Sequence, residues 1–360
     1  MKAIFTSKII ATVLLGQLLF VSPLLAQSTP VQALLILSKT ERTLAIVDPV
    51  SLKVIARAPV GPDPHEVIAS TDGKYAYVTN YGGGAYNTIA VIDLVEQKAL
   101  PSIELGALRG PHGLHYTGGK LWFTAEGAKV FGSYDPVKQQ VDFVQGTGQN
   151  RTHMIFVTDD LKRIVTTNIS SGTVSLFEKV MRGPGGPPPG SRPAGAPPSP
   201  SPSAPPPPAR EDWEQTLITV GKGPEGFDVT PDGKEIWVAN SQDGTVSIID
   251  AASKKVSQIL EANVRGANRL KFTPDGKRVF ISTLSGSDVT VIDTATRREV
   301  KRIKLGRGAA GIQMQPDGVR VYVACTPDDY VVVIDLQSLE VIGRIDVGKQ
   351  PDGMAWANRR

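Results

Sequence analysis

Short runs of alternating apolar and polar residues follow one another from about residue 33 to the end of the chain. Residues 226–230, 235–240, 245–250 and 255–260 are typical, because each run alternates and is rich in β-branched and aromatic residues, as half-buried strands are. The sequence Pro-Asp-Gly-Lys at 231–234 separates the first two runs. Proline presets φ for such a turn and glycine supplies its positive φ. The pattern predicts units of four short antiparallel strands.

An apolar-x-apolar-Asp phrase ends the third run of each unit and recurs along the chain. Its aspartates are Asp48, Asp93, Asp135, Asp250, Asp293 and Asp335. Successive spacings are 45, 42, 115, 43 and 42 residues, and the long gap holds one more unit, ending near Glu178, plus a surplus of 29 residues. Repeats of this length with four strands are typical of propeller blades. The sequence therefore predicts an all-β, seven-bladed β-propeller, and we interpret the aspartates as turn caps.

The two ends of the chain are predicted to complete one blade together. Residues 33–60 supply only three strands, and residues 352–357 resemble the missing innermost strand. We expect the C-terminal strand to join blade one and close the ring, which leaves no exposed sheet edge.

The four-residue phrase Tyr-Val-Thr-Asn occurs at 77–80, and Trp-Val-Ala-Asn at 237–240 and Tyr-Val-Ala-Cys at 322–325 are variants of it. On these motifs the chain resembles the YVTN family of repeat proteins from Ala33 to the C-terminus, apart from one insert. The resemblance implies a seven-bladed propeller that is often exported or surface-associated. It implies no particular activity, because function depends on sites rather than on the fold.

Residues 1–26 are predicted to be a secretory signal peptide. A basic start with Lys2 and Lys8 precedes an apolar run at 9–21, and the small residue Ala26 ends the segment, as in cleaved signals. The apolar run is short for a membrane span. We expect a single-domain mature chain of residues 27–360, exported to the periplasm, secreted or held at the cell surface, with no membrane span after cleavage. An uncleaved N-terminal anchor is the alternative.

Composition narrows the chemistry only slightly. The formal net charge is +4, to which the two lysines of the signal contribute, so nothing favours a nucleic-acid partner. Cys325 is the one cysteine, which excludes an intramolecular disulfide, covalent haem attachment and cysteine-based metal sites. It lies in mid-strand, where we expect it to be buried and inert. We expect a monomer.

Three of the four histidines occupy one position of the repeat. Aligning the starts of the innermost strands gives the column His65, His112, His153, Glu225, Asn268, Ala310 and Asp352. Innermost strands line the channel, so this column should circle one of its mouths. Imidazoles beside a carboxylate suit Zn, Cu or Fe, whereas packing at the start of the strand is the alternative explanation. The candidate ligand or metal residues are His65, His112, His153, Glu225 and Asp352.

A basic column lies three residues earlier in the repeat and should rim the same mouth. Its members are Arg109, Lys222, Arg265, Arg307 and Lys349. Such a rim would attract anionic ligands, although solvated lysine and arginine are also common in exposed turns. Residues 81–87 carry three glycines together with Tyr81 and Tyr86, and we expect them to form a flap over this mouth.

The insert at 181–209 belongs to blade four and should leave the opposite face. Thirteen of its 29 residues are proline, so we expect it to be disordered or polyproline-like and to act as a spacer or docking arm.

Two functions are compatible with these patterns. The favoured one is a binding or scaffold propeller that takes a small or anionic ligand, or a protein partner, at the channel face. The alternative is a metal-dependent lyase, hydrolase or oxidase with a divalent transition metal, Zn, Cu or Fe, at the histidine column.

Overall fold

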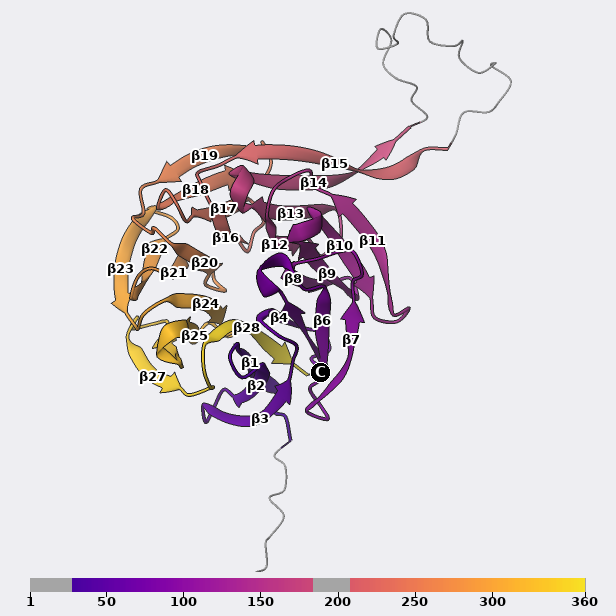
Figure 1. Ribbon diagram of the computed structural model, residues 1–360. Helices are drawn as coiled ribbons and strands as arrows, with labels where there is room; N and C mark the ends of the chain where they lie inside the picture. Colours follow the sequence, from indigo (N-terminus) through magenta and orange to yellow (C-terminus); the bar gives the residue numbers. More distant parts are fainter. Residues whose placement is uncertain (1–27, 184–207, 360) are drawn as a thin grey trace, which may run out of the picture.

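The computed structural model describes residues 28–183 and 208–359. Seven four-stranded antiparallel sheets form a ring around a central channel (Figure 1). The predicted all-β, seven-bladed propeller is therefore confirmed. The predicted signal peptide and residues 184–207 of the insert lie outside the described residues.

Each blade runs from an innermost strand at the channel to an outermost strand at the edge of the ring. In that order, blade one holds β28 (Pro351–Asn358), β1 (Gln32–Ser38), β2 (Thr43–Asp48) and β3 (Lys53–Pro59). Blade two holds β4 (Pro64–Ala69), β5 (Tyr75–Asn80), β6 (Thr88–Asp93) and β7 (Lys98–Glu104). Blade three holds β8 (Pro111–Thr117), β9 (Lys120–Ala125), β10 (Val130–Asp135) and β11 (Gln140–Gly146). Blade four holds β12 (Thr152–Val157), β13 (Arg163–Asn168), β14 (Thr173–Arg182) and β15 (Arg210–Thr219).

Blades five to seven complete the ring. Blade five holds β16 (Pro224–Val229), β17 (Glu235–Asn240), β18 (Thr245–Asp250) and β19 (Lys255–Leu260). Blade six holds β20 (Ala267–Phe272), β21 (Arg278–Thr283), β22 (Asp288–Asp293) and β23 (Arg298–Lys304). Blade seven holds β24 (Ala309–Met314), β25 (Arg320–Cys325), β26 (Tyr330–Asp335) and β27 (Val341–Ile345).

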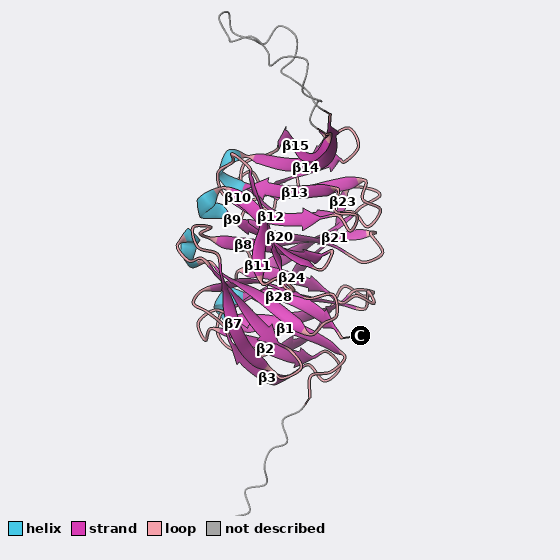
Figure 2. Ribbon diagram, turned by 90° about the vertical axis from the view of Figure 1, so that its right-hand side faces the viewer, coloured by secondary structure: helices cyan, strands magenta, loops and turns pink. Residues whose placement is uncertain are grey.

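Short 3-10 helices lie in four connections between second and third strands. They are η1 (Gly82–Gly84), η2 (Glu126–Ala128), η3 (Ile169–Ser171) and η4 (Thr326–Asp328). Figure 2 shows them together on one side of the propeller. We call this side the helical face.

The ring closes as the sequence predicts. β28 pairs antiparallel with β1, with Leu35 opposite Ala355, so the last strand of the chain completes the blade that the first strands begin. Blade four differs in detail from its prediction. β14 continues to Arg182, which pairs with Arg210 at the start of β15, so this hairpin reaches two residues into the segment assigned to the insert.

The recurring aspartates cap the tight turns after the third strands. The Asp48 carboxylate accepts the N–H of Val50 at 3.0 Å, and the Asp250 carboxylate accepts the N–H of Ser253 at 2.6 Å. Hydrogen bonds from Ser51 and Val50 lower the pKa of Asp48. The interpretation of these residues as turn caps is confirmed.

The core consists of apolar clusters packed between neighbouring blades. One cluster buries Leu35 and Leu44 of blade one against Val78 and Ile92 of blade two. Cys325 is fully buried in the cluster between blades six and seven, and burial raises the pKa of its thiol to about 12. The expectation of a buried cysteine is therefore confirmed, although Cys325 is the last residue of β25 and not in mid-strand.

Candidate ligand site at the channel mouth

Side-chain hydroxyls of the second strands fix the histidine column. The pairing of β8 with β9 shifts register between Pro111 and Leu114, and this irregularity frees the N–H of Gly113. The Thr124 hydroxyl accepts that N–H at 2.9 Å and donates to the carbonyl of His153 in the next blade at 2.6 Å. The Thr124 hydroxyl thus holds the irregular backbone of its own blade at Gly113 and also the backbone of His153 in blade four.

A similar arrangement recurs in blades two, four and six. Thr79, Thr167 and Ser282 accept the N–H of Glu66, Met154 and Arg269, respectively. Thr167 and Ser282 also donate to the carbonyls of Glu225 and Ala310. Thr79 is the threonine of the Tyr-Val-Thr-Asn phrase, so that phrase supports the channel strand of its own blade.

The three predicted histidines lie together on the helical face of blades two, three and four. Ring centroids are 4.5 Å apart for His65 and His112 and 3.7 Å apart for His112 and His153. The His112 side chain is fully buried, and neither of its ring nitrogens has a hydrogen-bond partner among the described residues. Burial, followed by the nearby charges of His153 and His65, lowers the pKa of His112 well below its usual range. His112 is therefore a neutral imidazole.

His153 lies between two carboxylates. Its Nδ1 contacts Glu126 Oε1, and its Nε2 lies 3.1 Å from Glu225 Oε1, at ion-pair distance but outside hydrogen-bonding geometry. The Tyr81 hydroxyl donates to Glu126 Oε2 at 2.5 Å. Burial acts to lower the pKa of His153, but Glu225 and Glu126 outweigh it and raise the pKa to about 9. His153 is accordingly an imidazolium at neutral pH.

His65 is held by a lysine instead. Lys39 Nζ donates to His65 Nδ1 at 2.6 Å and lies 3.1 Å from carboxylate oxygens of both Asp352 and Asp63. Burial, opposed by Asp352 and supported by Lys39, lowers the pKa of His65 to about 4. The mouth therefore presents two neutral imidazoles beside one charged imidazole.

A buried ion pair crosses the channel beneath the histidines. Arg269 of blade six contacts Glu66 Oε1 of blade two. The two strands that carry them, β20 and β4, lie in blades that are not neighbours, so their side chains span the axis. Arg269 is 5% exposed and also donates to the carbonyl of Asn268 at 3.1 Å. Because Glu66 follows His65 in the chain, this charged pair lies next to the histidine site.

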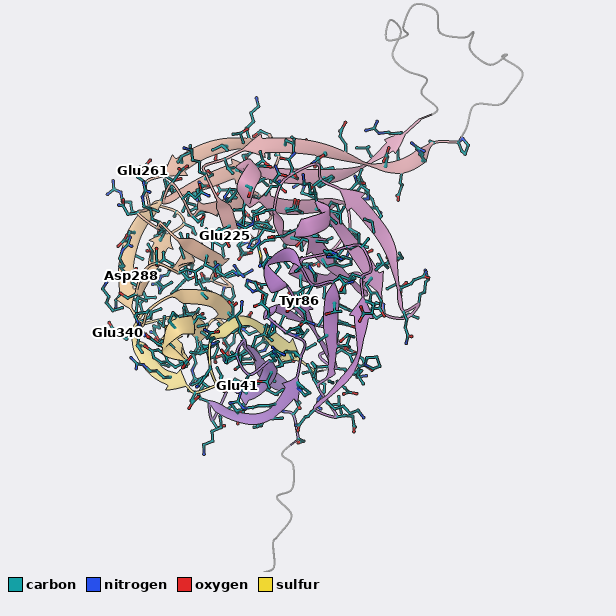
Figure 3. All side chains as sticks on the ribbon, in the orientation of Figure 1. Glu41, Tyr86, Glu225, Glu261, Asp288 and Glu340 are labelled. Carbon is teal, nitrogen blue, oxygen red and sulfur yellow. The ribbon has the colours of Figure 1, made fainter. Side chains whose placement is uncertain are left out.

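The remaining predicted residues are those of the basic rim and of the flap. The basic rim is exposed at all five of its positions, and Arg307 pairs with Asp328 at 2.7 Å. Of the predicted flap, Tyr81 enters the site, with its ring 5.1 Å from His65 and 5.0 Å from His112. Tyr86 is 41% exposed. In Figure 3, Glu225 lies next to the channel, whereas Glu261 and Asp288 lie near the outer edge.

Lys39 and Glu126 are site residues that the sequence patterns did not indicate. Each is the first residue after a second strand, a position that reads Lys39, Tyr81, Glu126, Ile169, Ser241, Leu284 and Thr326 around the ring. These connections share the helical face with the histidine column. Aligning the ends of the second strands would have shown three polar groups on consecutive blades, beside the histidines.

The predicted metal site is not preformed. Within residues 28–183 and 208–359, no group of three or more His, Cys, Asp or Glu side chains is arranged to hold a metal ion. The rings of His112 and His153 lie against one another, with centroids 3.7 Å apart, whereas the ligands of one metal direct their donor atoms at a shared point.

The fold and the site define a seven-bladed β-propeller with a polar histidine site at one mouth of its channel. By sequence, residues 208–312 match the family described as Cytochrome D1 heme domain. His65, His112 and His153 lie outside the matched residues, so the match supplies no histidine ligand for a haem. No curated protein matches the chain. None of the helices in the described segments is long and apolar enough to cross a membrane.

Solved structures share the fold at low sequence identity. A protein of unknown function from Desulfotomaculum acetoxidans has a TM-score of 0.70 at 14% identity, covering 91% of this chain and 99% of its own. A provisionally assigned 6-phosphogluconolactonase from Bacteroides uniformis has a TM-score of 0.70 at 16% identity, with the same coverage. Hydrazine synthase from Kuenenia stuttgartiensis has a TM-score of 0.62 at 17% identity, covering 81% and 89%. These similarities establish the propeller and carry no activity to this chain.

Proposed function

We propose that this chain is an exported propeller of the YVTN type that binds a small, polar, anionic ligand at the histidine site on the helical face. The observation that carries the proposal is His112, which is fully buried between two other imidazoles with both ring nitrogens unpartnered. An unmet buried donor or acceptor costs about 1–3 kcal/mol. A ligand group or bound water that reaches His112 would offset that cost.

The surrounding charges favour an anion that also carries hydroxyl groups. Positive charge at the histidine site comes from the His153 imidazolium and from Arg151, whose Nε lies 3.6 Å from Glu126. The five exposed residues of the basic rim add further positive charge. Among the described residues, no hydrogen bond engages the Glu225 carboxylate, which lies beside His153 and could accept a ligand hydroxyl.

A thermal-shift screen of the mature protein with phosphate, citrate, gluconate and other small organic acids tests the proposal. Saturating ligand at one hundred times Kd stabilises a protein by about 2.7 kcal/mol, which is several degrees in Tm. We expect at least one acid to raise Tm, and the shift to vanish in His112→Ala. The matched control is His115→Ala, because His115 packs against Phe156 at 5.1 Å on the other side of its strand. No shift with any acid, or a shift that survives in His112→Ala, would refute the proposal.

A metal-dependent enzyme is the second candidate, and the contact of three imidazoles on neighbouring blades favours it. Elemental analysis of untagged protein, prepared in metal-replete buffer, distinguishes it from simple ligand binding. Stoichiometric Zn, Cu or Fe that is lost in the His65→Ala/His112→Ala double variant would establish the metal site. Protein without bound metal in both forms would exclude this candidate.

A further inference from the structure

A cleft lies between blades two and three, and none of the three site histidines lines it. Its volume is about 1370 Å³, and its walls include Tyr75, Tyr77, Tyr116 and Tyr134. The turns that border it, at 70–72, 117–119 and 136–140, join first to second strands and third to fourth strands. These turns lie at the strand ends opposite the helical face. We call it the tyrosine cleft.

The tyrosine cleft combines flat aromatic walls with free hydroxyl groups. The rings of Tyr77 and Tyr116 stack at 5.7 Å with an interplanar angle of 14°, and Leu100 and Val141 add apolar wall. Within the described residues, no hydrogen bond engages the hydroxyl of Tyr77 or Tyr134. Burial raises the pKa of Tyr134, so its hydroxyl remains a protonated donor.

Acidic side chains border the tyrosine cleft. Asp72, Glu104 and Asp159 all line it. Aromatic-lined grooves are the surfaces on which polyproline II segments dock, and the carbonyls of such a segment accept hydrogen bonds from hydroxyl donors. The acidic border adds a preference for a segment without acidic residues.

One segment of this chain has the required composition. Residues 184–207 contain twelve prolines among 24 residues, no Asp or Glu, and one basic residue, Arg192. The segment joins β14 to β15, a connection between third and fourth strands, so it begins and ends on the side of the propeller where the tyrosine cleft opens. Blade four also borders the cleft directly, through Asp159 in its first turn.

The segment is long enough to reach. A polyproline chain rises about 3.1 Å per residue, so 24 residues span about 74 Å, and an excursion out and back reaches about 37 Å. The four strands of a blade lie about 4.8 Å apart, so a blade is about 14 Å across. The reach therefore exceeds twice the width of blade four.

We propose that the tyrosine cleft between blades two and three is a binding site for a proline-rich polypeptide, and that residues 184–207 of this chain occupy it. Because residues 184–207 are part of the same chain as the cleft, a weak intrinsic affinity is enough for the cleft to be mostly occupied. A short flexible connection gives an effective concentration on the order of 1 mM. A segment that binds with a Kd of about 0.1 mM as a free peptide would then be about 90% bound within the chain.

The test uses a variant that lacks residues 184–207, in which Gly183, Pro208 and Ala209 close the β14–β15 hairpin. A labelled synthetic peptide of residues 184–207 is titrated against this variant and against the full-length mature chain, with fluorescence anisotropy as the measurement. We expect binding to the variant with a Kd near 0.1 mM, and about tenfold weaker binding to the full-length chain. A peptide with every proline replaced by alanine is the control and should not bind.

Substitutions in the deletion variant locate the site. Tyr116→Ala should weaken peptide binding at least tenfold, and Tyr134→Phe, which keeps the ring and removes one hydroxyl, should weaken it about threefold. Tyr86→Ala, at an exposed tyrosine on the helical face, is the matched control and should leave binding unchanged. Circular dichroism melting confirms that each variant is folded.

Three outcomes would overturn the proposal. The first is a peptide that does not bind the folded deletion variant. The second is binding that both Tyr116→Ala and Tyr134→Phe leave unchanged. The third is equal affinity for the deletion variant and the full-length chain, which would mean that residues 184–207 do not occupy the cleft and that its ligand is another polypeptide.

Discussion

The native protein should lose stability as the pH rises from 6.5 to 9, and replacing His153 by glutamine should abolish this loss. His153 has a usual pKa of 6.5 and a folded-state pKa of about 9, raised by Glu225 and Glu126 against the effect of burial. Between these pH values the folded state holds one proton more than the unfolded state. The free energy of unfolding should therefore fall by about 1.4 kcal/mol per pH unit.

The whole contribution is present below pH 6.5 and is lost as the pH rises through 9. Over this window it amounts to roughly 3 kcal/mol, which is a large share of the stability of an ordinary domain. Glutamine fills similar space and does not titrate. His153→Gln should start less stable at pH 6.5 and show no slope from pH 6.5 to 9.

Urea unfolding at pH 6.5, 7.5, 8.5 and 9 measures the slope in both proteins. His115→Gln is the control, because burial lowers the pKa of His115 to about 4 and leaves it neutral throughout this window. The native protein and His115→Gln should lose stability in parallel. If the free energy of unfolding of His153→Gln still falls between pH 6.5 and 9, the assignment of a positive charge to His153 is wrong.

Three further predictions concern Glu126, the Thr124 hydroxyl and the C-terminal strand β28. Glu126→Gln removes one of two carboxylates beside His153, so the ring should titrate below pH 9 in an NMR titration; an unchanged midpoint would contradict the assignment. Thr124→Val leaves a buried N–H and a buried carbonyl unpaired and should cost about 2 kcal/mol in urea unfolding. Thr290→Val removes a buried hydroxyl that has no partner among the described residues, so it should not lower stability and should raise it by up to about 1–3 kcal/mol. Ending the chain before Pro351 removes the innermost strand of blade one and should abolish cooperative melting; an unchanged melting midpoint would refute closure by that strand.

The fold followed from the sequence because each blade repeats the same local chemistry. The turn aspartates recur at nearly constant spacing, since each caps a turn of the same shape, and the constancy made the missing unit and the insert visible. The C-terminal strand was predictable for a related reason, because a ring with an unfilled innermost position would expose strand edges. These are local rules, and a single sequence is enough to apply them.

The site was predictable only where it followed the same repeat. His65, His112 and His153 share one column, so alignment of the innermost strands found them. Glu126 and Lys39 come from a different position of the repeat, and their role depends on side-chain reach across a blade boundary. The Arg269–Glu66 pair connects blades six and two, and no spacing along the chain indicates which residues meet across the channel.

The hydroxyl contacts imply that binding and stability are partly separable in this propeller. The column residues are held through backbone groups, because Thr124 and Thr167 donate to the carbonyls of His153 and Glu225. A side chain in the column can therefore change while its backbone position is kept. Where such a hydroxyl is present, backbone position depends on the second strand, whereas ligand chemistry depends on the column residue itself. The positions of His153, Glu225 and Ala310, whose carbonyls accept from Thr124, Thr167 and Ser282, can thus carry His, Glu or Ala without altering the ring that presents them.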